Sequence, residues 1–179
     1  MQLKEQYKKE VVPALKEAFG IKNIFAVPTI KKVTVSVGIS AKHKDTKIME
    51  TAEETLRRIT GQKPVRTKAK QSIAGFKIRE GNEVGLMVTL RGPRMWDFLT
   101  KLTRVTFPRV RDFRGISRKQ VDARGNISIG FKENLAFPEI RPDEVDRLHG
   151  LQVTVVTDAG SREKGVKLYE GLGFPFMNE

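Results

Sequence analysis

Alternation of apolar and polar residues along short segments is the feature that most constrains this fold. Over residues 30–37, valines at every second position alternate with Lys32, Thr34 and Ser36. Residues 83–91 alternate in the same way, with Thr89 and Arg91 on the polar side. Such strands bury one face only, so the other face of their sheet is left open to solvent.

Helical spacing of apolar residues recurs between these strands. The expected helices cover 2–19, 45–61, 92–108 and 161–170, and the further strands cover 64–70, 127–131 and 151–157. Pro13 is expected to kink or divide the first helix, and Ser161 to cap the last. This order predicts an α+β fold with a mainly antiparallel sheet, helices packed on one face and an open polar and basic face. At 179 residues we expect a single domain, 1–179.

The most basic stretch runs from Lys63 to Arg79, with six basic residues and no acidic one. Its strand is expected to turn Val65, Thr67 and Ala69 inward and Arg66, Lys68 and Lys70 outward. A charge run of this kind can be a solvated face, but its placement on a strand favours contact with a phosphate backbone. In the following loop, 71–82, the apolar residues Ile73, Phe76 and Ile78 either fold back onto the core or face RNA on a loop that orders on binding.

Charge is unevenly distributed along the chain. The formal net charge is +13 and the isoelectric point about 10.1. Residues 133–179 carry nine acidic and five basic residues, so the positive excess lies in 1–132. A second basic region, 104–124, mixes arginines with an aromatic residue, as is common where chains enter folded RNA. Two surfaces with two kinds of partner are expected.

Several classes of protein are disfavoured by what the sequence lacks. There is no cysteine, and the two histidines, His43 and His149, have no ligand-type neighbours, so no metal site or cofactor is expected. The run from Gly160 to Lys167 lacks the lysine of a phosphate-binding loop, and no catalytic constellation is visible, so an enzyme is not expected. No membrane span is seen, which by default indicates the cytoplasm.

Aromatic residues are missing from the strand segments Val33–Val37 and Val84–Leu90. A common RNA-recognition module stacks bases on aromatics in its central strands. The open face is therefore expected to bind RNA through hydrogen bonds and charge, which suits a folded RNA better than a splayed single strand.

A longer pattern runs through nearly the whole chain. It includes L-R-R-I-T-G-Q-K-P-V-R-T-K-A-K-Q-S at 56–72, I-A-G-F-K-I-R at 73–79, P-R-V-R-D-F-R-G at 108–115 and F-P-F at 174–176. These motifs resemble those of the bacterial-type large-subunit ribosomal protein five family, which binds 5S rRNA in the central protuberance. The resemblance implies a structural constituent of the large ribosomal subunit with large-subunit rRNA and other 5S-binding ribosomal proteins as neighbours.

The resemblance also implies a role for particular residues. Gln62 and Thr89 are the best carried-over contacts to 5S rRNA, and the expected sheet-face set is Lys32, Thr34, Ser36, Gln62, Arg66, Lys68, Thr89 and Arg91. At position 36, relatives often carry asparagine. Ser36 keeps a hydroxyl at this place but lacks the amide donor of asparagine.

Two further contacts follow from the same resemblance. The loop residues expected near peptidyl-site tRNA are Ala74, Gly75, Phe76, Lys77, Ile78 and Arg79. The region expected at an intersubunit bridge to small-subunit protein thirteen contains Arg109, Arg111, Asp112, Arg114, Glu139, Asp143, Glu144 and Asp146. The alternatives are a structured-RNA chaperone or regulator off the ribosome, which sedimentation with large subunits would distinguish, and an RNA-modifying enzyme, for which no motif is present.

Overall fold

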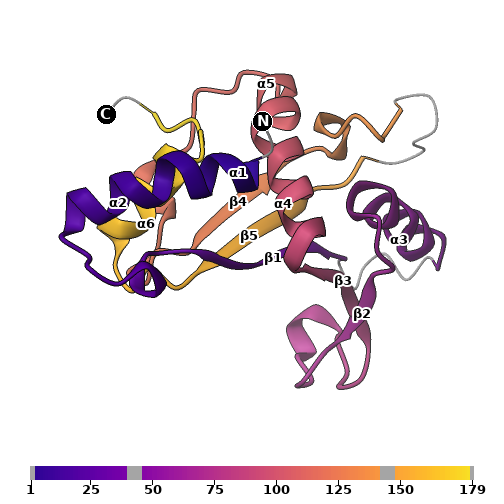
Figure 1. Cartoon of the computed structure of the whole chain (residues 1–179). Coiled ribbons are helices and arrows are strands. Elements are labelled where there is room, and N and C mark those ends of the chain that lie inside the picture. The colour runs from indigo at the N-terminus through magenta and orange to yellow at the C-terminus, as the bar shows by residue number, and fades with distance from the viewer. Residues whose placement is uncertain (1–2, 40–45, 142–147, 178–179) are drawn as a thin grey trace. The chain divides into compact units, whose positions relative to one another are not determined.

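The computed structural model describes residues 3–39, 46–141 and 148–177. The strands are β1 (Ile30–Gly38), β2 (Val65–Lys68), β3 (Glu83–Leu90), β4 (Ile127–Phe131) and β5 (Leu151–Thr157). The α-helices are α1 (Leu3–Gln6), α2 (Val12–Phe19), α3 (Thr46–Thr60), α4 (Gly92–Lys101), α5 (Phe107–Arg109) and α6 (Arg162–Gly171). Figure 1 shows this order from the indigo N-terminus to the yellow C-terminal region.

The strands form one open antiparallel sheet in the order β2-β3-β1-β5-β4. In the β2–β3 pair, Val65 lies opposite Met87 and Arg66 opposite Leu86, with a register shift between Thr67 and Lys68. With helices between the strands, this confirms the predicted α+β fold with an open antiparallel sheet.

The chain comprises two compact units. Unit 1 contains Met1–Val33, Leu90–Ile129 and Thr154–Glu179, and unit 2 contains Thr34–Thr89 and Gly130–Val153. Each unit is therefore assembled from segments that are distant in the sequence. The single domain expected over 1–179 stays a prediction.

Unit 1 has a helical layer in which α1 packs against α4, and α2 against α6. Its interior contains fully buried side chains from all parts of the unit, among them Leu3, Leu15, Leu99, Leu102, Phe107, Ile127 and Tyr169. Each large side chain removed from water in this way stabilises the fold by roughly 1.5–3 kcal/mol. In the helix that begins at Gly92, the side chains of Met95, Phe98 and Leu99 are buried, whereas Val105 in the following turn is 39% exposed.

Pro13 and Pro108 each follow a short π-helical turn. The two turns cover Tyr7–Val11 and Leu102–Thr106, so each ends two residues before its proline. Proline lacks an N–H, and its ring would collide with the carbonyl four residues earlier in a regular α-helix. The wider π turn accommodates the ring, and both helices continue beyond the proline, to Phe19 and Arg109 respectively.

Unit 2 is built around α3 and the β2–β3 pair. Its core is formed by Val35, Val37, Leu56, Ile59, Leu86, Val88 and Phe137. Helix α3 ends at Thr60, and Gly61 follows with a φ of 66°, a left-handed conformation that glycine adopts without strain. This stop, predicted from the sequence, directs the chain from the helix into Gln62 and then β2.

Candidate RNA interface

The open face of unit 2 presents small hydroxyl side chains. Thr34 and Ser36 on β1 and Thr89 on β3 are half-buried, whereas the alternate residues Val35 and Val88 are almost completely buried. This alternation confirms the predicted faces of β1 and β3. Lys32 and Arg91 belong to unit 1, where Lys32 is half-buried and Arg91 is exposed.

Gln62 and Thr89 meet on unit 2 although 27 positions separate them in the sequence. The Gln62 side-chain amide donates to the Thr89 carbonyl oxygen at 3.4 Å. On the other side, the Gln62 backbone N–H donates to the Thr60 hydroxyl at 3.3 Å, which fixes the residue at the end of α3. The bond to Thr89 uses one amide hydrogen, so the amide oxygen of Gln62 and the Thr89 hydroxyl can serve a ligand.

Gly85 lies where β3 passes closely beside its neighbouring strands. A Cβ atom there would lie 2.5 Å from the Val37 carbonyl oxygen and 3.1 Å from the Thr67 hydroxyl. Backbone at 2.5 Å cannot be displaced cheaply, so the position excludes every residue except glycine. A strand surface with no side chain at Gly85 and hydroxyls on its neighbours suits close approach by a ribose–phosphate backbone.

The predicted faces of β2 are wrong. Val65 is 65% exposed and pairs with exposed Met87, while Arg66 pairs with Leu86, which is buried. Side chains of directly opposed residues share a face, so Arg66 lies on the side of the buried residues rather than on the open face. Two residues further along β2, Lys68 lies opposite Glu83 of β3 in the sheet register.

Carboxylates explain how an arginine is accommodated on that side. The Arg66 guanidinium contacts Glu53 of α3 at 3.0 Å and Glu83 at 3.1 Å. The hydrogen bonds that Arg66 donates, first to Glu53 and second to Glu83, raise its pKa above the usual value for arginine. An inward-pointing charge also protects an edge strand from pairing with other chains. Arg66 therefore has two anionic partners within the protein before any RNA is present.

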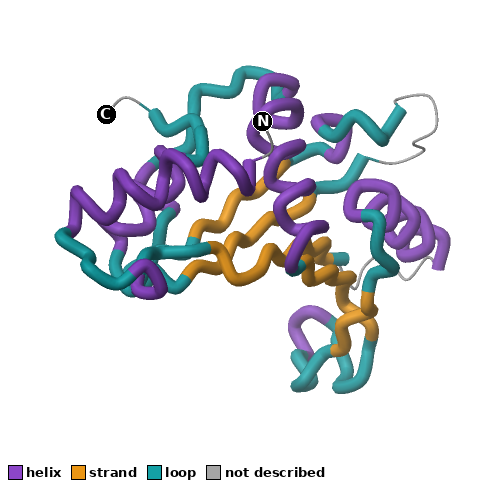
Figure 2. The backbone as a smooth tube through the Cα atoms, in the orientation of Figure 1, coloured by secondary structure: helices purple, strands orange, loops and turns teal. Residues whose placement is uncertain are grey.

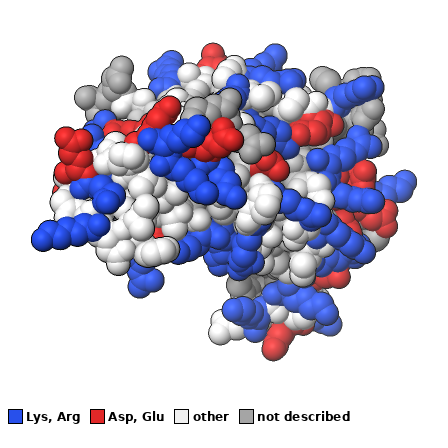
Figure 3. Space-filling view, viewed as in Figure 1, with Lys and Arg blue, Asp and Glu red and all other residues white. Residues whose placement is uncertain are grey.

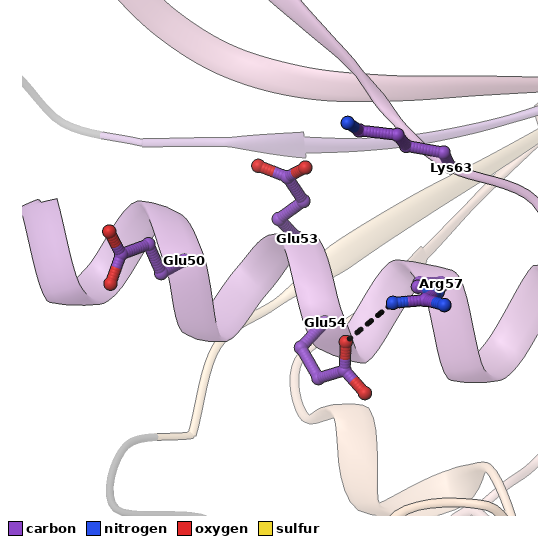
Figure 4. A pocket seen from close by; sticks show the side chains of 5 residues that line it. All are labelled: Glu50, Glu53, Glu54, Arg57 and Lys63. Carbon is purple, nitrogen blue, oxygen red and sulfur yellow. Dashed lines mark ion pairs between the residues drawn. The ribbon is translucent and has the colours of Figure 1, made fainter.

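The same side of unit 2 carries an open pocket of about 500 Å³ beside α3. Figure 4 shows its lining, in which Glu53 projects toward the strand and Glu54 pairs with Arg57; the lining residues are Glu50, Glu53, Glu54, Arg57 and Lys63. The lining carries three carboxylates against two cations, so the pocket offers a phosphate backbone no excess of positive charge.

The loop at 71–82, here called the hairpin tip, closes on itself. Ile73 and Ile78 exchange backbone hydrogen bonds of 2.9 and 3.1 Å around a 3₁₀ turn at Ala74–Phe76. Phe76 is 69% and Ile73 46% exposed, so neither side chain folds back onto the core. Figure 2 shows the turn at the end of the β2–β3 hairpin, and Figure 3 shows basic side chains around it. All residues from Ala74 to Arg79 are exposed or half-buried.

The segment 107–116, here called the arginine segment, is anchored within unit 1. Arg109, Arg111, Asp112 and Arg114 are exposed, whereas the Phe113 ring stacks on Phe107 with centroids 5.2 Å apart. Ile116 exchanges backbone hydrogen bonds with the C-terminal strand segment, donating to Pro175 at 2.8 Å and accepting from Met177 at 3.0 Å.

The acidic part of the predicted bridge region is only partly described. Glu139 is half-buried and belongs to unit 2, while the arginine segment belongs to unit 1. Asp143, Glu144 and Asp146 lie outside the described residues.

Comparison with known proteins identifies the family. A family model described as "Ribosomal protein L5" matches residues 23–79, and a second model, for the C-terminus of the same ribosomal family, matches 83–176. The chain belongs to the ribosomal protein L5 family. It is 49% identical to "Large ribosomal subunit protein uL5" of Roseiflexus sp. (strain RS-1) over 98% of both chains. It is 52% identical to the protein of that name from Rubrobacter xylanophilus over 97% of both chains.

Family membership confirms the resemblance seen in the motifs. Proteins of this family are structural, non-enzymatic constituents of the large ribosomal subunit, consistent with the predicted rRNA association and ribosomal location. No helix in the described part of the chain is long and apolar enough to cross a membrane. Over the same residues, no group of three His, Asp or Glu side chains is placed to hold a metal ion.

Proposed function

We propose that this protein anchors 5S rRNA through the open face of β1 and β3, with Gln62 and Thr89 at the centre of the contact. The observation that carries the proposal is the bond between the Gln62 amide and the Thr89 carbonyl, which joins the end of α3 to β3. It holds the Gln62 amide beside β3, on which Thr89 carries a hydroxyl, and the neighbouring strand β1 carries the hydroxyls of Thr34 and Ser36. Such groups suit the 2′-hydroxyls and phosphates of a folded RNA.

The charge of the face supports a backbone contact. Lys32 and Arg91 add cations at the unit 1 ends of the same two strands. Arg66 and Lys68 remain proposed contacts from the family resemblance, but Arg66 would have to leave Glu53 and Glu83 to reach RNA. We therefore rank it below the hydroxyl and amide groups.

The same proposal assigns two further contacts. The hairpin tip would touch peptidyl-site tRNA, supported by the exposure of Phe76 and of the cations Lys77 and Arg79. The arginine segment, with the acidic region around Glu139, would face small-subunit protein thirteen. Its exposed arginines on an anchored backbone support a stable contact surface.

The test is a gel-shift titration of 5S rRNA with tRNA as competitor and salt varied. Gln62→Ala and Thr89→Ala should each weaken binding by roughly 1–3 kcal/mol, because each leaves a polar partner unpaired in the complex. The logarithm of the affinity should fall with the logarithm of salt, with a slope of about −0.7 to −0.9 per neutralised phosphate.

Thr51→Ala is the matched control. Its hydroxyl donates to the Lys47 carbonyl at 2.8 Å on α3, so its loss should leave the affinity for 5S rRNA unchanged. Wild-type affinity in both sheet-face variants, or binding that tRNA abolishes as readily as 5S rRNA itself, would refute the site.

A further inference from the structure

A short turn between α2 and β1 exposes two large apolar side chains. Residues 22–26 are all exposed, and the Phe25 and Ile24 side chains are 92% and 58% exposed. No other large hydrophobic side chain in the described chain is as exposed as Phe25. Leaving a phenylalanine in water forgoes the stabilisation that its burial would supply, so the ring is available to a partner.

The backbone holds this ring outward. The Asn23 side-chain oxygen accepts from the Phe25 backbone N–H at 2.9 Å, and the Val27 N–H donates to the Ile24 carbonyl at 3.3 Å. Immediately after the turn, Val27 and Pro28 are buried, and the Tyr7 hydroxyl donates to the Pro28 carbonyl at 3.0 Å. The conformation of the turn is therefore fixed before a ligand arrives, which lowers the entropy lost on binding.

The electrostatic surroundings of the turn are cationic. From Ala18 to Val33 the chain contains Lys22, Lys31 and Lys32 and no acidic residue. Asp158 is the carboxylate that contacts this segment, and it is already engaged by Lys31 at 2.7 Å and by the Thr29 N–H at 2.6 Å. Lys22 beside the turn thus remains available to an anion.

We propose that Phe25 is a stacking platform for one unpaired base of ribosomal RNA, with Lys22 at an adjoining phosphate. An exposed ring on a hydrogen-bonded turn, with Lys22 three residues before it, suits single-stranded nucleotides, because every base has a face that stacks on an aromatic ring. One ring and one isoleucine form too small an apolar patch for a stable protein partner, which needs about 800 Å² on each side.

This contact goes beyond the sheet-face site. It lies in unit 1 and uses stacking, whereas Gln62 and Thr89 lie in unit 2 and use hydrogen bonds. The two can therefore fail independently: Thr89→Ala tests the sheet face, and Phe25→Ala tests the turn.

The experiment measures the affinity of full-length variants for two probes, 5S rRNA and 23S rRNA, at constant salt. Phe25→Ala should weaken binding to one of them about 5–150-fold, the equivalent of roughly 1–3 kcal/mol per stacked base. Phe25→Trp should retain binding, and the fluorescence of the introduced tryptophan should be quenched when that RNA is added. Because the ring is 92% exposed, the melting temperature of Phe25→Ala should match that of the wild type.

Two controls separate stacking from charge and from general apolarity. Leu148→Ala removes another exposed large apolar side chain, 53% exposed, and should leave both rRNA affinities unchanged. Lys22→Ala should reduce the salt slope by about 0.7–0.9, whereas Phe25→Ala should leave the slope as it is.

Three results would overturn the proposal. The first is wild-type affinity of Phe25→Ala for both rRNAs. The second is full recovery by Phe25→Leu, which would show that apolar contact suffices without a ring. The third is impaired subunit assembly with unchanged affinity for both RNAs, which would assign the turn to a protein partner.

Discussion

The hairpin tip and the arginine segment contain similar residues but place their phenylalanines in opposite environments. In the tip, Phe76 is 69% exposed on a turn whose hydrogen bonds are internal. In the arginine segment, Phe113 stacks on buried Phe107, which in turn contacts Phe174 at 5.9 Å. The same mixture of cations and an aromatic thus yields an exposed ring in one unit and an anchor in the other. Composition alone does not distinguish these two environments. They differ in whether the phenylalanine ring packs on another ring of the protein.

The largest expected effect is at the anchor of the arginine segment. Phe107→Ala should lower the free energy of unfolding by about 3–5 kcal/mol, because the side chain is 1% exposed and its removal leaves a cavity. Urea denaturation measures the change. A loss below about 1 kcal/mol would mean that the aromatic stack does not support this segment.

A pair of glycine substitutions compares the two backbones directly. Gly115→Ala should cost about 2–3 kcal/mol, because φ is 102° and the new Cβ would lie 2.8 Å from the Met177 nitrogen. At Gly81 in the tip, φ is 83° and an added Cβ would have no atom within 4 Å. Gly81→Ala should therefore incur only the backbone cost of about 1–2 kcal/mol. Thermal unfolding of both variants provides the comparison, and equal losses would remove the steric part of the argument.

The smallest stability change is expected when the same substitution is made at the two phenylalanines. Phe113→Ala should cost about 1–2 kcal/mol, since an aromatic pair contributes about 0.5–1.5 kcal/mol beyond the area it buries. Phe76→Ala should stay within about 0.5 kcal/mol of wild type, as is usual for exposed positions. Urea denaturation measures both changes. If Phe76→Ala lowered the free energy of unfolding more than Phe113→Ala, the comparison would be reversed.

The sequence predicted the architecture well where one face of an element is wholly apolar. The alternation in β1 and β3, the glycine stop at Gly61 and the Ser161 cap, which accepts from the Lys164 N–H at 3.4 Å, were all found. These features depend on neighbouring residues, so local spacing is sufficient to reveal them.

The sequence failed where the decisive partner is distant. The face of β2 was predicted wrongly because Glu53, which neutralises Arg66, lies 13 positions earlier in a helix. Val65 was placed inside because alternation alone cannot tell an edge strand from a central one. The exposed turn at Phe25 was also missed, although an acid-free run with two apolar residues between Gly20 and Pro28 offered a signal.

The pairing of Ile116 with Pro175 and Met177 has a consequence for the order of events during synthesis. The ribosome makes the arginine segment well before residues 174–177, so that segment has neither its partner strand nor the Phe174 ring when it leaves the exit tunnel. The backbone bonds of Ile116 and the contact between Phe107 and Phe174 can form only after residues 174–177 have been made. A nascent chain that has not reached residues 174–177 therefore lacks the support of this surface, and engagement of the arginine segment waits for that part of the chain.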